Sequence, residues 1–263
     1  MMFIENNAKL KILRNLVFTD RCNLRTVNKD FNNIFKKYKH EKTVYGNYNK
    51  NINYGEYKNI FFSLNHINKP LINVSNNVYI FNIMQKEIAD SRIKKIPSEL
   101  SNVHTLCLNN LPNIKELPLE LGNVHTIKLL NLPNIKKLPS ELGNVHSLSL
   151  MYLLNLKELP SELGNVYTLS LDSLPNIKEL PLELGNVHTL RLNNLLNLKE
   201  LPSELGNVHT LELWNLQKIK ELPLELGNVH TLVLDFLTNL KELPSEFKNI
   251  KNQIPFNKKK KFK

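Results

Sequence analysis

The chain has 263 residues, and its hydrophobic content of 41% is enough for one elongated domain with a small extra module. Its two cysteines, Cys22 and Cys107, lie far apart in the sequence, which excludes a disulfide-stabilised scaffold and favours a reducing compartment. The net charge of +11 is uneven, since residues 103–249 hold 12 basic and 16 acidic groups while both flanks are basic. This central stretch is therefore not expected to bind polyanions.

The first residues, MMFIENNAKLK, lack the arrangement of a secretory signal peptide. No apolar run reaches the roughly 18 residues that a membrane-spanning helix needs. We therefore expect a protein of the cytoplasm or the nucleus that has no membrane partner.

Residues 1–42 carry apolar side chains at helical spacing. One set lies within residues 8–16 and a second within residues 24–35, and either Thr19 or Asp20 is placed to cap the second helix. The pattern predicts two or three short helices. Because about 40 helical residues rarely fold alone, we expect this module to pack on a neighbouring domain or a partner.

This helical module resembles an F-box. Ile12 and Leu13 match the first apolar pair of that motif, and Asp20 matches the acid that starts its helix. Leu24 and Val27 match its second apolar pair, and Phe31 matches its aromatic position. Asn28-Lys29-Asp30 matches its polar-basic segment, whereas Phe3-Ile4 replaces its opening Leu-Pro. The resemblance implies that these six side chains bind the adaptor subunit of a ubiquitin ligase. In the alternative interpretation the helices only cap the following domain.

Residues 43–77 are rich in Asn, Tyr and Lys and are expected to form a connector, with a degenerate repeat around Ile60, Phe62 and Leu71. Residues 78–102 align better with the repeats described below, since VYIFNI matches VHTLCL. This unit is 25 residues long because its centre carries four extra residues. We expect an atypical capping repeat here, as is usual at the end of a repeat array.

Residues 103–249 contain seven units of 21 residues each, and their first residues are Val103, Val124, Val145, Val166, Val187, Val208 and Val229. The alternating apolar residues at the start of a unit predict a short strand. A proline then interrupts backbone pairing, and a Gly-Asn pair turns the chain into the next unit. One unit cannot bury its own leucines, so the units must stack with parallel strands about 4.8 Å apart.

The 21-residue unit resembles the short intracellular leucine-rich repeat. The resemblance implies an α/β repeat solenoid with a parallel β-sheet on its concave side, preceded by the small α-helical F-box-like module. Where many such families place Asn or Cys, the ninth position of each unit is Leu. We therefore expect the Asn at the end of each unit to replace the usual buried asparagine ladder.

Residues 250–263 are expected to cap the last coil through Ile250, Ile254 and Phe256 and to end in a basic tail, FNKKKKFK. A lysine run of this kind is typical of a nuclear-import signal or a phosphate-contacting tail. A tail that is only solvated is an equally good interpretation. The Asn, Lys and Ile usage is also similar to that of proteins from giant DNA viruses and amoebae.

The binding candidates are positions that differ between otherwise nearly identical units. If the strand leucines point inward, the residues that alternate with them face the concave surface. Variation concentrated on that face favours a binding surface, with neutral drift as the alternative. The predicted partner-binding residues are Lys128, Met151, Tyr152, Asp172, Arg191, Glu212, Trp214, Val233, Asp235 and Phe236. The preferred anchor patch is Trp214, Val233 and Phe236, and Met151 with Tyr152 forms a second candidate.

A histidine recurs in six of the seven units, with Tyr167 in the fourth. No Cys or acid accompanies these rows in a zinc-ligand pattern, so we expect no metal and no cofactor, and a pH response is the better hypothesis. No nucleophile motif, phosphate loop or catalytic carboxylate pair is present in a suitable context, so an enzyme is not expected.

Together these features indicate a monomeric, noncatalytic recognition protein. If the F-box resemblance holds, it implies a substrate-recognition subunit of a cullin–RING (SCF-type) ubiquitin ligase, which holds a target protein on its concave face. The alternatives are a leucine-rich-repeat scaffold without a ligase, and weak nucleic-acid association through the basic ends.

Overall fold

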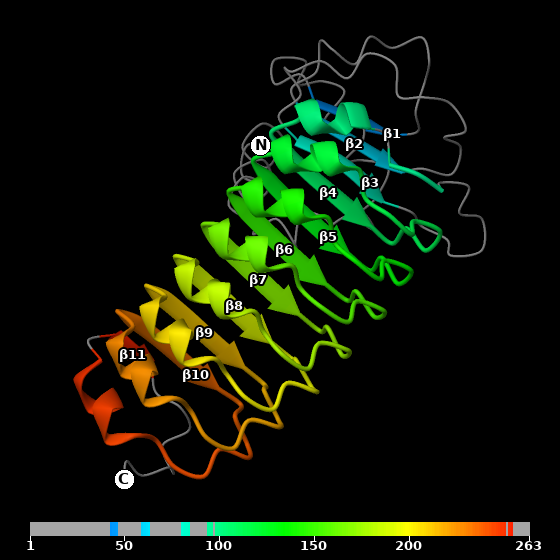
Figure 1. Ribbon diagram of the computed structural model, residues 1–263. Helices are drawn as coiled ribbons and strands as arrows, with labels where there is room; N and C mark the ends of the chain where they lie inside the picture. The colour runs from blue at the N-terminus through cyan, green and yellow to red at the C-terminus, as the bar shows by residue number, and fades with distance from the viewer. Residues whose placement is uncertain are drawn as a thin grey trace, which may run out of the picture.

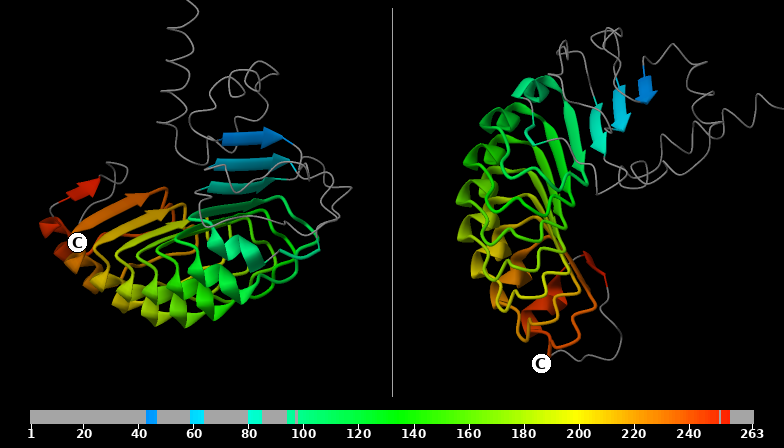
Figure 2. Two further views of the ribbon diagram at one scale, coloured as in Figure 1. Left: turned by 90° about the horizontal axis from the view of Figure 1, so that it is seen from above. Right: turned by 90° about the vertical axis from the view of Figure 1, so that its right-hand side faces the viewer.

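The computed structural model describes residues 43–46, 59–63, 80–84, 94–96, 98–250 and 252–254. These residues form an arc of stacked coils, with one strand of each coil on the concave side and the 3-10 helices on the convex side (Figures 1 and 2). The helices predicted for residues 1–42 lie outside the described residues.

All described strands belong to one parallel sheet in which they follow one another in sequence order (Figure 1). The strands are β1 (Thr43–Gly46), β2 (Asn59–Ser63), β3 (Ile80–Met84), β4 (Thr105–Asn109), β5 (Thr126–Leu130), β6 (Ser147–Met151), β7 (Thr168–Asp172), β8 (Thr189–Asn193), β9 (Thr210–Trp214), β10 (Thr231–Asp235) and β11 (Asn252–Ile254). From β4 to β10, each residue pairs with the one 21 positions later, for example Arg191 with Glu212. The predicted parallel sheet is therefore confirmed.

The convex side consists of single turns of 3-10 helix. They are η5 (Ser98–Asn102), η6 (Leu119–Asn123), η7 (Ser140–Asn144), η8 (Ser161–Asn165), η9 (Leu182–Asn186), η10 (Ser203–Asn207), η11 (Leu224–Asn228) and η12 (Ser245–Asn249). Each of η6 to η12 follows a proline in extended conformation, whose carbonyl accepts the first helical hydrogen bond, as from Leu121 to Pro118 at 3.2 Å. The chain must reverse direction twice within each coil of 21 residues, and the tight 3-10 turn suits so short a coil.

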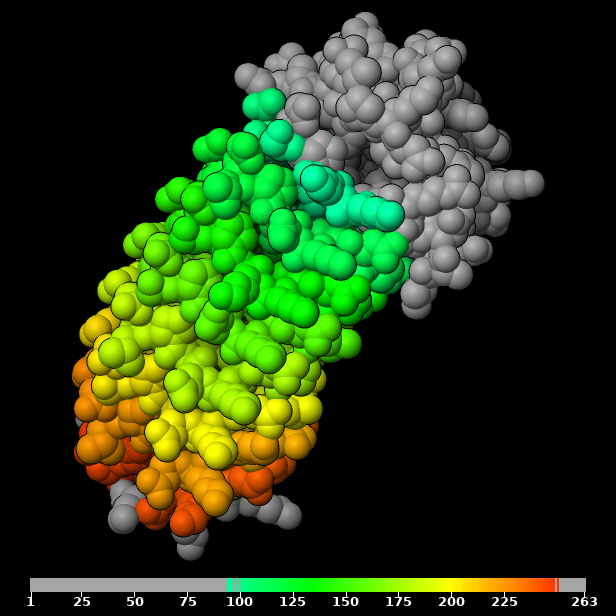
Figure 3. Space-filling view, turned by 45° about the vertical axis from the view of Figure 1, so that its right-hand side comes forward, coloured from blue at the N-terminus to red at the C-terminus, as the bar shows by residue number. Residues whose placement is uncertain are grey.

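The leucines of neighbouring coils share one continuous interior. On β8, Leu190 and Leu192 have no exposed surface, whereas Arg191 between them is exposed. The space-filling view shows the successive coils in contact along the array (Figure 3). At roughly 1.5–3 kcal/mol for each buried aliphatic side chain, this interior is the main source of stability, and no single coil could supply it.

The glycine that recurs in the 3-10 turns from η6 to η11 is explained by close packing between coils. A Cβ atom built on Gly185 would lie 2.3 Å from the carbonyl oxygen of Glu204 in the next coil. At Gly227 the nearest such contact is 3.1 Å, to the Cβ of Glu246. Glycine therefore allows one 3-10 turn to rest directly on the backbone of the next.

The sheet extends beyond the seven regular units at both ends. Two strands, β1 and β2, lie in the segment expected to be a connector, and Asn59 pairs with Ile80, again 21 positions later. At the other end β11 pairs with β10. The repeat geometry therefore continues where the sequence pattern has faded.

The asparagine ladder lies at a position that the sequence analysis did not expect. In successive coils the Nδ2 of Asn155, for example, donates to the carbonyl oxygen of Pro133 at 2.6 Å, and Asn176 bonds to Leu154 in the same way. The end-of-unit asparagines, such as Asn144, are exposed at the ends of the 3-10 turns. The expectation that they form the ladder is wrong, because their side chains face solvent and not the preceding coil.

Candidate partner-binding face

Three rows of side chains run across the coils on the concave side. The central row is Cys107, Lys128, Ser149, Ser170, Arg191, Glu212 and Val233. The end row is Asn109, Leu130, Met151, Asp172, Asn193, Trp214 and Asp235. The turn row, one residue further along, is Asn110, Asn131, Tyr152, Ser173, Asn194, Asn215 and Phe236. The central and end rows are the two most variable positions of the repeat unit, and the three rows together contain all of the predicted partner-binding residues.

The predicted residues differ in how much surface they present. Tyr152 and Phe236 are 47% and 63% exposed, and Arg191 is also exposed. The half-buried members are Lys128, Met151, Asp172, Glu212, Trp214 and Asp235. Val233, part of the preferred anchor patch, is only 7% exposed, so it offers little surface to a partner.

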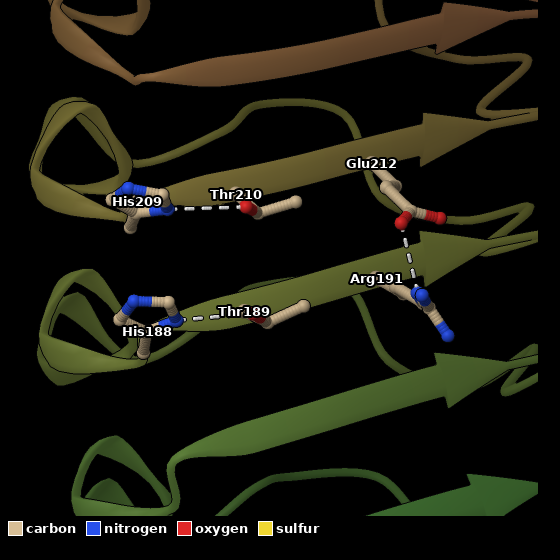
Figure 4. A network of polar contacts seen from close by, with 6 residues as sticks. All are labelled: His188, Thr189, Arg191, His209, Thr210 and Glu212. Carbon is tan, nitrogen blue, oxygen red and sulfur yellow. Dashed lines mark hydrogen bonds and ion pairs between the residues drawn. The ribbon is translucent and has the colours of Figure 1, made fainter.

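An ion pair joins two strands in the middle of the face. The Nε of Arg191 on β8 lies 2.9 Å from a carboxylate oxygen of Glu212 on β9 (Figure 4). The Arg191 side chain is 54% exposed and the Glu212 side chain 18%. The two opposite charges largely offset one another, and a pair this exposed adds little to stability.

Two aspartates on the end row are held in place by hydrogen bonds. Asp172 accepts bonds from the hydroxyl of Ser173 at 2.7 Å and from the amide of Asn193 at 3.0 Å. Asp235 accepts the backbone N–H of Phe236 at 2.9 Å. Both carboxylates are half-buried on the concave side, where they are oriented before any partner arrives.

Trp214 is the only tryptophan of the chain and lies at the end of β9, half-buried. Its backbone pairs with Asn193 on β8 and with Asp235 on β10. The structure thus places Trp214 beside Asp235 of the next coil. Phe236, which directly follows Asp235, belongs to the turn row of that coil. Tyr152, on the turn after β6, lies four strands from Phe236, or about 19 Å at the usual strand spacing.

The turn row adopts a backbone conformation that its sequence did not reveal. All seven residues have φ between 50° and 56°, in the left-handed region. Asparagine tolerates this region, whereas a bulky side chain rarely occupies it. The sequence signal was the recurrent Asn at this position, which the sequence analysis interpreted only as part of a variable surface.

The recurrent histidines form a continuous stack with Tyr167. Neighbouring ring centroids lie 4.4–4.8 Å apart from His104 to His230. In His188 and His209 the Nδ1 lies 3.2 and 3.3 Å from the hydroxyl of the adjacent threonine (Figure 4). Burial, followed by the neighbouring imidazoles of His104 and His146, lowers the pKa of His125.

Some exposed apolar residues were missed by the sequence analysis. Leu154 and Leu196 are 45% and 38% exposed two residues after the turn row, where three other units have proline. On the convex side each of three leucines is 57% exposed at the start of its 3-10 turn: Leu119, Leu182 and Leu224. Other units have serine there, and that contrast was visible in the sequence.

Within the part of the chain that the structure describes, no group of three or more His, Cys, Asp or Glu side chains could hold a metal ion. In the same part, no helix is long and apolar enough to cross a bilayer.

Comparison with protein families identifies an F-box domain at residues 6–42. Those residues include the six predicted adaptor-binding side chains, which lie outside the described structure. The F-box resemblance seen in the sequence is therefore confirmed at the level of the family. A comparison with curated proteins gave no match.

The solved structures that resemble the chain are leucine-rich-repeat proteins. The leucine-rich repeat domain of the type III effector XopL is 19% identical with a TM-score of 0.56, over 70% of each chain. The Leptospira interrogans leucine-rich repeat protein LIC12759 is 21% identical with a TM-score of 0.42, over 68% of this chain and 59% of that one. An internalin, InlF, from Listeria monocytogenes is 16% identical with a TM-score of 0.44, over 84% and 88%.

The chain therefore combines an F-box domain with a leucine-rich-repeat solenoid. F-box domains are typically noncatalytic interaction domains, so the match at residues 6–42 beside a repeat solenoid indicates a protein-interaction module.

Proposed function

We propose that this protein is the substrate-recognition subunit of a cullin–RING (SCF-type) ubiquitin ligase. Its F-box would dock on the adaptor subunit, and its concave face would hold a target protein for ubiquitination by the other subunits. The observation that carries the proposal is the F-box match at residues 6–42 next to a solenoid whose two most variable positions both lie on the concave face. In this proposal the chain itself performs no chemistry and acts as a monomer.

The proposed domain organisation places the adaptor-binding module at residues 1–42 and a linking segment at residues 43–77. An atypical capping repeat at residues 78–102 precedes the seven regular repeats of residues 103–249, and residues 250–263 form a cap and basic tail. The first described strand begins at Thr43, directly after the F-box match.

A pull-down of the full chain with the small adaptor subunit tests the proposal. We expect wild-type chain to retain the adaptor and the double variant Leu24→Asp with Phe31→Asp to lose it, because charge in an apolar docking surface leaves unpaired buried groups. The matched control is Leu119→Asp, which alters an exposed convex leucine far from the F-box sequence. Equal retention by the double variant and the wild type would exclude the ligase function and leave a plain interaction scaffold.

A further inference from the structure

The turn row shows which side chains its backbone prefers. Asn131 donates its side-chain amide to the Oδ1 of Asn110 at 2.9 Å, and Asn215 donates to the Oδ1 of Asn194 at 3.0 Å. Asn194 in turn donates to the hydroxyl of Ser173. Asparagine here both tolerates the positive φ and links one coil to the next.

Tyr152 and Phe236 occupy the same row without either advantage. Their φ angles are 55° and 52°, and their rings cannot extend the amide chain. Tyr152 is about half exposed and Phe236 more than half, so both rings gain less from packing inside the molecule than a buried ring would. Strained residues that the fold does not require are typical of binding sites, and exposed aromatic rings supply strong anchors for a partner.

The surface between these two rings is acidic. Asp172, Glu212 and Asp235 lie on the strands from β7 to β10, and Arg191 is the one basic residue of the central and end rows there. Because Arg191 is paired with Glu212, the two oriented aspartates are the uncompensated charges. A ligand that complements this edge has two apolar side chains about 19 Å apart, one for each ring, and positive charge between them. About six residues of extended chain span that distance.

The chain contains such a segment directly after its last described strand. Phe256 and Phe262 are six residues apart, and residues 258–261 between them are all lysine. Backbone pairing places Ile254 of β11 level with Val233 of β10, so two further residues bring the chain to the edge that holds Phe236. Eight residues beyond Ile254 reach about 26–29 Å, and β6 lies about 24 Å from β11.

We propose that residues 256–262 bind in cis along this edge of the concave face. Phe256 packs beside Phe236, Phe262 packs beside Tyr152, and the lysines lie along the aspartates. Tethering gives such a segment an effective concentration in the millimolar range, so even weak contacts suffice. This inference rests on the proposed function in one respect: the face that the tail covers is the face that receives the target. The target must therefore displace the tail when it binds.

The fluorescence of Trp214 provides the test, because it is the sole tryptophan and lies on β9 between the two anchors. In the full chain without any adaptor, acrylamide quenching should increase when Phe256 and Phe262 are both changed to Ser. It should also increase in wild type at high salt, which screens the lysine–aspartate attraction. A synthetic peptide of residues 255–263, added to the double variant, should restore protection.

The face variants Tyr152→Asn and Phe236→Asn should raise the quenching as the tail variant does, and combining them with the tail variant should add nothing further. They should also raise the melting temperature, by roughly 2–4 °C each, because Asn fits the positive φ and extends the amide ladder. Leu119→Ser, a convex change to the residue found in other units, should leave the quenching unchanged.

Identical quenching in wild type and the Phe256→Ser, Phe262→Ser variant, at low and at high salt, would overturn the proposal. So would a peptide that protects the Tyr152→Asn, Phe236→Asn chain as well as it protects the tail variant. Neither outcome depends on adaptor binding, so it leaves the pull-down result intact.

Discussion

The buried and the exposed residues of a single strand obey different constraints. On β8, Leu190 and Leu192 repeat in kind in every unit and have no exposed surface, whereas the residue between them is Arg in this unit and Cys, Lys, Ser, Glu or Val elsewhere. The inward side must fill a space whose width the next coil sets. The outward side meets only solvent or a partner, so its variation is available for recognition.

The largest expected effect comes from breaking the inward side. Leu192→Ala should lower the free energy of unfolding by about 2–5 kcal/mol, because it leaves a cavity between stacked coils. Arg191→Ala, one residue earlier on the same strand, should change it by less than about 1 kcal/mol, since its ion pair is exposed. Urea unfolding of the two variants measures both values. Similar losses would contradict the division between the two faces.

The convex turns extend the comparison to the backbone. Gly185→Ala should destabilise the chain by about 1–3 kcal/mol, because its Cβ would lie 2.3 Å from a backbone oxygen that cannot move aside. Gly227→Ala is the matched control, with its nearest contact at 3.1 Å, and should have a smaller effect. Thermal unfolding of both variants provides the measurement. An equal loss would mean that conformational freedom, and not close packing, explains these glycines.

Trp214 tests the outward side. Trp214→Ala should weaken the natural target by about 2 kcal/mol or more if it is a hot spot, because aromatic anchors contribute most of the binding energy of an interface. Its effect on stability should be smaller than that of Leu192→Ala, since the ring is only half-buried. Titration calorimetry with the target identified by affinity capture measures the loss. A change below about 0.5 kcal/mol would move the predicted site elsewhere on the face.

The smallest effect concerns the histidine stack. Because burial and its neighbours lower the pKa of His125 in the folded chain, the unfolded chain binds its proton more readily. Stability should therefore fall as the pH drops from above the unfolded value of about 6.5 through the lower folded value. His125→Tyr keeps a ring in the stack, as Tyr167 does, and should reduce this loss. Urea midpoints at about pH 7.5 and pH 5 compare the two chains, and equal loss would exclude His125 as the cause.

Much of the candidate site followed from the sequence because the repeat is so regular. Once the leucines at Leu211 and Leu213 are inward, alternation alone places Glu212 and Trp214 on the concave side, and the structure agrees. The exposure of Val233 could not be predicted this way, since alternation gives the direction of a side chain and not what lies over it. Its place in the anchor patch stays a prediction, although only 7% of its surface is exposed.

The period of 21 residues, the inward leucines, the strand positions and the F-box resemblance were all determined by the sequence alone, because they depend on local pattern. Only the tertiary structure showed which asparagines donate hydrogen bonds across coils and which glycines lie against the backbone of the next coil. It also showed that Tyr152 and Phe236 adopt positive φ. These features depend on the distance between residues that are 19 to 22 positions apart. Only stacking of the coils sets that distance.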